Sequence, residues 1–206
     1  MGETQEQHGG IGTETAGSTG LADRVSLGTG AVAGVGAYVL GYLLTYLTQA
    51  GAVRDRLAGL NFLASLFGGE QVAAWQGVGW YFYNAHFVST TVPSFGGTRT
   101  ANLIASADAN LAYLYVLPPL ALLAAGAGVA FLADAGDPAD GAVAALGVVP
   151  AYFLLALAGA FVFAYGGGDA GSVHPEYVTA ALLAGLVYPA VFGAVGGAVA
   201  GVVGGE

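Results

Sequence analysis

Lysine and cysteine are both missing from this chain of 206 residues, and its only basic residues are four arginines. Without cysteine there is no disulfide, no thiol nucleophile and no thiolate metal site. We expect no nucleic-acid partner, because binding to phosphates requires clustered basic side chains. The same lack leaves no polybasic segment for anionic lipid headgroups.

Charge of either sign is scarce. Only 8% of the residues are charged, 56% are hydrophobic, and the mean hydropathy is +0.70. Soluble proteins carry about 25% charged residues. A hydrocarbon core of about 30 Å is crossed by roughly 20 apolar helical residues. The sequence therefore predicts an all-α, polytopic transmembrane helix bundle, a multi-pass protein of the cell membrane with the lipid bilayer as its partner.

Long stretches without Asp, Glu, Lys or Arg set the boundaries of the predicted helices. They predict a transmembrane helical domain at 21–206 with five spans, at about 26–49, 71–92, 109–133, 141–165 and 177–203. Residues 54–68 place leucines at helical spacing but are too short to span, so we expect a short interfacial helix there. The polar residues 1–20 predict a disordered acidic tail.

The acidic residues outnumber the basic ones, and the net charge is −9. An acidic surface without lysine is typical of proteins bathed in concentrated salt, because carboxylates retain their hydration there. This pattern favours a halophilic archaeal origin. The alternative is a membrane protein from a GC-rich bacterium.

The predicted span at 71–92 differs from the others because it is aromatic and polar. It contains both tryptophans and His86, and an ionisable side chain at membrane depth is a candidate for function. On a continuous helix Tyr83 and Thr90 share the face of His86, while Asn84 points elsewhere. We hypothesise a ligand-binding site formed by His86, Tyr83, Thr90, Asn84 and Trp80. The alternative is an aromatic belt at the interface with an internally bonded polar pair.

Small residues recur at a spacing of four in the last predicted span. Such rows allow close approach of helix backbones, either within one bundle or between copies in an oligomer. The row consists of Gly193, Gly197, Gly201 and Gly205. Two histidines outside the tail are too few for a metal site, so we expect no metal and no cofactor. No catalytic residue is assigned.

The run Gly79–Val88, GWYFYNAHFV, resembles a segment in a family of small uncharacterised membrane proteins of haloarchaea, some of which are labelled as transporters. The resemblance implies a haloarchaeal origin and a membrane location. Our leading hypothesis is a transporter-like or ligand-binding membrane subunit without enzymatic activity, acting as a homo-oligomer or as part of a membrane complex. One alternative is a purely structural or assembly protein. A third is a membrane enzyme that uses His86.

Overall fold

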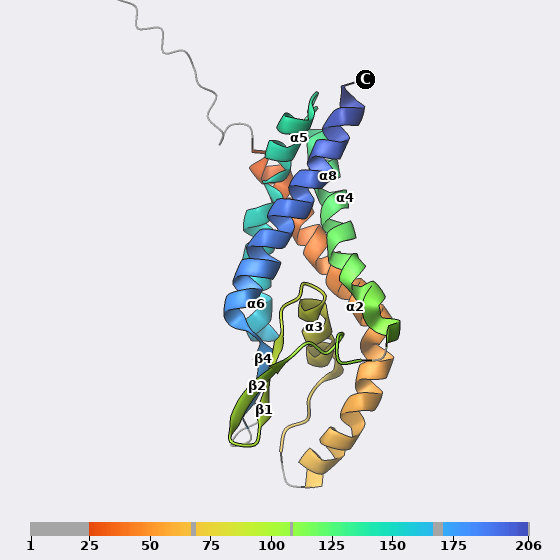
Figure 1. Ribbon diagram of the computed structural model, residues 1–206, viewed down its shortest axis with the longest axis vertical. Coiled ribbons are helices and arrows are strands. Elements are labelled where there is room, and N and C mark those ends of the chain that lie inside the picture. The colour runs from red at the N-terminus through yellow and green to blue at the C-terminus, as the bar shows by residue number, and fades with distance from the viewer. Residues whose placement is uncertain (1–24, 67–68, 108, 167–170, 206) are drawn as a thin grey trace, which may run out of the picture.

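The computed structural model describes residues 25–66, 69–107, 109–166 and 171–205. These residues are mostly helical, and the long helices lie side by side as a bundle at one end (Figure 1). A short helix and a small sheet occupy the other end, beside the second half of the first helix. The tail predicted at 1–20 lies outside the described residues.

Four helical segments among the described residues are long and apolar enough to cross a membrane. They are Leu27–Leu66, Leu111–Leu132, Pro138–Val162 and Tyr177–Gly204. The prediction of five spans was therefore wrong by one, although the predicted all-helical bundle accounts for most of the chain.

Helix α2, Leu27–Leu66, is a single helix of 40 residues. At 1.5 Å per residue it is about 60 Å long, about twice the thickness of a hydrocarbon core. The separate interfacial helix predicted at 54–68 is instead the continuation of the first span, as far as Leu66. The helix continues because no proline interrupts it, and because Arg54, Asp55 and Arg56 are exposed on its surface.

The other three long segments are not uniform, because two change helix type and one is divided into two α-helices. The structure has a 3₁₀ helix η1 (Ala109–Val116) followed by α4 (Leu117–Leu132), then α5 (Pro138–Ala145) and α6 (Val148–Val162), then α7 (Tyr177–Thr179), a π-helix η3 (Ala180–Val187) and α8 (Tyr188–Gly204). Pro118, Pro150 and Pro189 lie beside these changes. Each proline lacks an N–H, and its ring clashes with the carbonyl four residues before it, which interrupts the regular helix.

The bundle interior is built from small residues. Helix α8 packs on α4 and α5, and α2 packs on α4 and α6. A Cβ atom at Gly197 would lie 2.2 Å from the carbonyl oxygen of Gly141 on α5, so these two backbones touch directly. Large apolar side chains point outward instead, and Val32, Leu47 and Phe131 are each at least 75% exposed. This inside-out pattern is the one that lipid-facing helices adopt.

Residues 71–92 do not form a span. They contain α3, Ala74–Asn84, whose 11 residues extend only about 16 Å, and the first strand of a sheet. The strands are β1 (Thr90–Ser94), β2 (Gly97–Ala101), β3 (Tyr165–Gly166) and β4 (Ser172–Pro175), paired antiparallel in the order β2-β1-β4-β3. Gly96, with φ of 82°, allows the tight β1–β2 turn.

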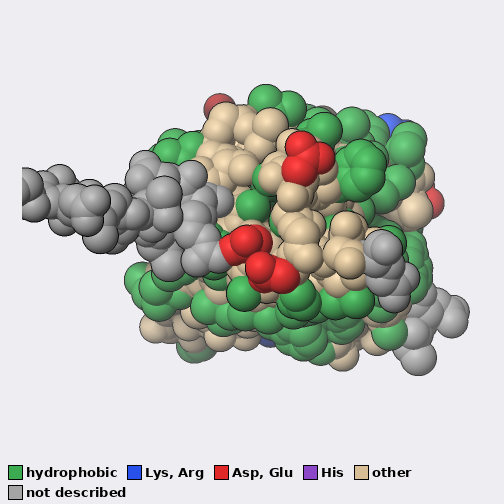
Figure 2. Space-filling view, turned by 90° about the horizontal axis from the view of Figure 1, so that it is seen from above, with side chains coloured by type: hydrophobic (Ala, Val, Ile, Leu, Met, Phe, Trp, Pro, Cys, Tyr) green, Lys and Arg blue, Asp and Glu red, His purple; other side chains and the backbone are tan. Residues whose placement is uncertain are grey.

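The end of the bundle away from the sheet carries acidic residues. Seen from that end, acidic side chains lie within the face and hydrophobic side chains surround them (Figure 2). Asp137 begins α5 there, and its carboxylate accepts hydrogen bonds from the backbone N–H groups of Ala139 (2.8 Å) and Asp140 (2.9 Å). This acidic turn separates two of the long apolar segments.

Candidate functional site

Helix α3 carries most of the predicted site and is packed inside the protein. All its residues from Gly77 to Asn84 are buried. The indole N–H of Trp80 donates to the carbonyl of Phe163 at 2.8 Å, and the amide of Gln76 donates to the carbonyl of Ala164 at 3.0 Å. Both carbonyls lie at the C-terminal end of α6, where a helix leaves carbonyls without partners. Side chains of α3 therefore provide hydrogen-bond donors for the carbonyls at the end of α6.

His86 lies in the turn after α3 and is completely buried. Its Nδ1–H donates to the carbonyl of Phe82 at 2.8 Å, and its Nε2 therefore accepts from the hydroxyl of Tyr152 at 2.7 Å. Burial lowers the pKa of His86 to about 4, although the bond to Phe82 acts in the opposite direction. The ring is neutral at pH 7 and packs on Tyr188, with ring centres 4.9 Å apart.

Tyr83 connects three helices. Its hydroxyl donates to the carbonyl of Ala156 on α6. The hydroxyl of Tyr38 on α2 lies 3.1 Å from that of Tyr83, and donates to it because the Tyr83 proton is already used. We refer to Tyr38, Tyr83, His86 and Tyr152 as the Tyr–His layer. It ties α3 to the interior of the bundle.

Asn84 connects α3 to the sheet. Its side-chain amide donates to the carbonyl of Val88 at 2.7 Å and to the hydroxyl of Thr90 at 3.0 Å. Its side-chain oxygen accepts from the backbone N–H of Leu103, which follows β2. Asn84, Val88 and Thr90 are all fully buried. One side chain therefore fixes the end of α3, the start of β1 and the loop beyond β2.

The structure brings the predicted site residues into one buried region, but not with the predicted geometry. The expectation that Tyr83, His86 and Thr90 share a helix face was wrong, because the helix ends at Asn84 and the chain turns at Phe87, where φ is 59°. Thr90 instead lies on β1 and bonds Asn84.

No ligand-binding space is evident beside this cluster. In the described part of the chain, every buried side-chain nitrogen and oxygen has a hydrogen-bond partner. Of the five predicted residues, only Trp80 lines either of the two described cavities. The contacts of the other four are the contacts of a packed, hydrogen-bonded interior.

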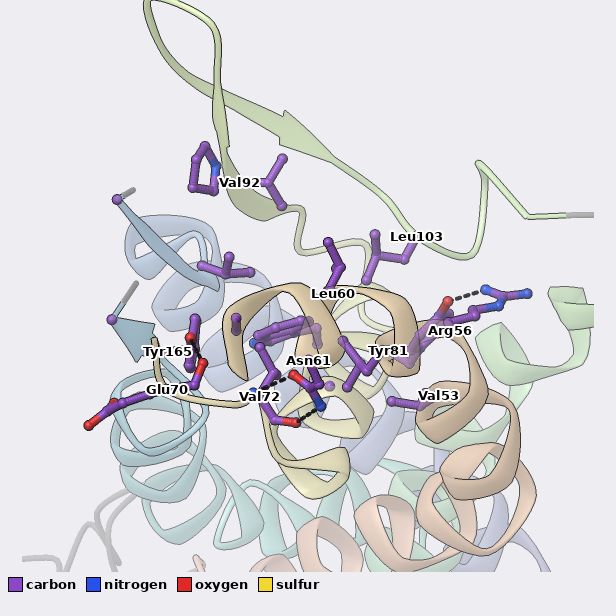
Figure 3. Close-up of a pocket in the computed structure, with 18 of the residues that line it drawn as sticks. Val53, Arg56, Leu60, Asn61, Glu70, Val72, Tyr81, Val92, Leu103 and Tyr165 are labelled. Atoms are coloured by element: carbon purple, nitrogen blue, oxygen red, sulfur yellow. Dashed lines mark hydrogen bonds between the residues drawn. The ribbon is translucent and has the colours of Figure 1, made fainter. Parts of the chain in front are cut away.

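A groove of about 1200 Å³ opens between the second half of α2, α3 and the sheet (Figure 3). Its walls are mainly apolar, with Leu57 and Val92 on opposite sides. Arg56 donates to the hydroxyl of Tyr81 at one end of the view, while Asn61 exchanges hydrogen bonds of 2.8 and 3.0 Å with the backbone of Val72. The groove combines an apolar wall with a few fixed polar groups, as small-molecule sites do.

A protein-family profile matches residues 12–204 of this chain. The chain belongs to DUF7978, a family of unknown function. No curated protein and no solved structure matches it. The DUF7978 match runs through the bundle, α3 and the sheet, so the groove is built entirely from residues within the family domain.

Sequence reasoning missed the groove residues Arg56, Asn61, Tyr81 and Arg99. The leucine spacing after Arg56 did indicate an amphipathic helix, but its apolar side was assigned to the bilayer surface. In the structure Val53 and Leu57 on that side are buried against α3, the loop after β2 and the 3₁₀ helix η1. The sheet that forms the opposite wall was not predicted either.

The glycine row of α8 packs within the chain. Cβ atoms at Gly197, Gly201 and Gly205 would lie 2.2, 2.2 and 2.6 Å from backbone oxygens of Gly141, Asp137 and Gly136. Gly193 is buried in the same interface. This face of α8 is therefore covered by α5 and the turn before it, and a homo-oligomer would have to use another surface.

Proposed function

We propose that this protein is a multi-pass protein of the cell membrane that binds a small ligand in the groove beside α3. The groove is the observation that carries the proposal. It has the mixed lining of a ligand site, and its volume of about 1200 Å³ is somewhat above the roughly 300–1,000 Å³ typical of such sites.

The membrane location is supported by where the apolar side chains lie. Four segments have the length and composition of spans. The outward faces carry large exposed residues, among them Leu154 (63%), Leu182 (53%) and Val199 (59%). A water-soluble monomer rarely exposes apolar surface on this scale. The acidic, lysine-free composition remains our reason for proposing a halophilic archaeal source.

Four spans also favour one orientation. With five spans, the four arginines divide equally between the two sides. With four, Arg54, Arg56 and Arg99 all lie at the groove end. Because short loops rich in arginine remain in the cytoplasm, we place the groove on the cytoplasmic side.

The other hypotheses differ in what they require. A transporter requires a path between the helices, and the Tyr–His layer fills that region with bonded side chains. An enzyme based on His86 requires a reactive partner, but both ring nitrogens are engaged by Phe82 and Tyr152. A purely structural protein requires no groove, so filling the groove distinguishes it from our proposal.

The test fills the groove with one large side chain. Ala64 on α2 lines the groove, while Ala58 on the same helix is exposed outside it. Native mass spectrometry of protein purified with its lipids should detect a retained small molecule in the wild type and in Ala58→Trp, but not in Ala64→Trp. A retained mass that is unchanged in Ala64→Trp, or no retained mass in the wild type, contradicts the proposal.

A further inference from the structure

Resting on the proposed function, we infer that the groove binds an anionic amphiphile, a molecule with a carboxylate or phosphate headgroup and an apolar chain. The headgroup lies at Arg56, Arg99 adds positive charge to the lining of the same groove, and the chain lies along the apolar wall.

The distribution of positive charge is the first argument. The chain has a net charge of −9 and only four arginines, yet two of the four line this one groove. In the described part of the chain neither Arg56 nor Arg99 forms a salt bridge, although thirteen acidic residues are present in the sequence. Two guanidinium groups without a carboxylate partner favour an anion as the ligand.

The placement of the two arginines is the second argument. Arg56 donates to the hydroxyl of Tyr81, and its Cζ lies 5.8 Å from the centre of that ring. Because a guanidinium has five N–H donors, the bond to Tyr81 orients the group and leaves donors for a ligand. Arg99 is paired directly with Val92 across the β1–β2 hairpin. Directly opposed residues lie on the same face of a sheet, and Val92 lines the groove.

The apolar wall and the acidic end give the ligand its direction. Val53 and Leu57 are nearly fully buried and form the wall with Leu60 and Leu103. Glu70 lies at the end of the groove opposite Arg56 (Figure 3). A negative headgroup is attracted to the Arg56 end and repelled from the Glu70 end, so the chain points toward Glu70.

The place of the groove along α2 is the third argument. About 20 residues of α2 from Leu27 fill the hydrocarbon core, which brings the helix to about Leu47. The groove begins at Val53, about 9 Å further along the helix. This is the outer edge of the headgroup layer, which extends about 5–8 Å beyond the hydrocarbon core. An amphiphile in the adjacent leaflet therefore lies next to the mouth of the groove.

Trp80 lines the groove and provides a direct measure of binding. The experiment uses full-length protein with Trp75→Phe in phosphatidylcholine vesicles, so that Trp80 is the only tryptophan. The probe is 9,10-dibromostearate, whose bromines quench nearby indole fluorescence, and its uncharged methyl ester is the comparison. We expect half-maximal quenching at a concentration at least tenfold lower for the acid, because hydrogen bonds to a charged group contribute about 1.5–3 kcal/mol.

The double variant Arg56→Gln/Arg99→Gln should lose this tenfold preference, while Arg54→Gln, which is outside the groove on the same helix, should keep it. Inorganic phosphate should not displace the acid. Displacement by phosphate would show that the arginines bind a free anion, and overturns the inference. Equal quenching by acid and ester, both blocked by the non-fluorescent groove-filling variant Ala64→Leu, overturns the inference but leaves the proposed function intact. No quenching by either contradicts both.

Discussion

Replacing Asn84 by alanine tests whether the predicted site residues hold the protein together. The substitution removes hydrogen bonds to the carbonyl of Val88, the hydroxyl of Thr90 and the backbone N–H of Leu103. The two backbone groups cannot turn toward other partners. Leaving a buried polar group without a partner costs about 1–3 kcal/mol. We expect Asn84→Ala to lower the free energy of unfolding by about 3 kcal/mol.

The measurement is thermal unfolding in detergent, followed by tryptophan fluorescence. Both tryptophans lie on α3, the helix that Asn84 joins to the sheet. For a domain of about this length, 1 kcal/mol shifts Tm by about 2–4 °C, so we expect a decrease of about 6–12 °C. Asn61→Ala is the matched control. Its amide also makes two hydrogen bonds, but in a part-buried position where water can replace them.

Equal Tm values for Asn84→Ala and Asn61→Ala would refute the reasoning, because burial would then make no difference. A wild-type Tm for Asn84→Ala, together with loss of the ligand detected by native mass spectrometry, would restore Asn84 as a binding residue.

Three further predictions follow from packing, protonation and topology. The pKa of His86 is lowered from 6.5 to about 4 on folding, so the unfolded chain binds the proton more tightly than the folded protein does. The free energy of unfolding is therefore highest above pH 6.5 and falls by about 3 kcal/mol as the pH decreases to 4. In His86→Gln, Tm should not show this decrease. Gly197→Leu should prevent folding or lower Tm strongly, because its Cβ would contact the α5 backbone. Gly36→Leu should fold normally, because nothing lies within 4 Å of the Cβ position at Gly36. Equal Tm values for the two variants would contradict the packing of α8 on α5. The chain has no cysteine, so Ser65→Cys and Gly204→Cys each introduce a single thiol. With four spans, a membrane-impermeant maleimide should label these two variants from opposite sides of the membrane. Labelling of both variants from the same side would support five spans.

The four long apolar segments could be predicted from the absence of charge alone. Lipid-facing helices require apolar residues over about 20 positions, and the chain contains few charges that would interrupt them. The segment at 71–92 met the same criterion for a different reason. Its residues avoid charge because protein surrounds them, as the burial of every residue from Gly77 to Asn84 shows.

The sequence did contain a signal for the strand that replaces the end of this predicted span. Val88, Thr90, Thr91 and Val92 are β-branched, and Pro93 with Gly96 indicates a turn. Strand β1, however, is stabilised by pairing with β4, more than 70 residues later in the chain. Local patterns do not show such a partner. The groove could not be predicted for the same reason, since its walls come from segments far apart in the sequence.

The continuity of α2 has a mechanical consequence. The same helix forms part of the bundle and one wall of the groove, so a tilt of its bundle half also moves the half that lines the groove. Helices respond to a thinner or thicker bilayer by changing their tilt. A rotation of about 5° moves the end of a 30 Å arm by about 3 Å, comparable to the width of a methylene chain. If α2 spans a bilayer as proposed, such a change of tilt would move the wall of the groove relative to the sheet.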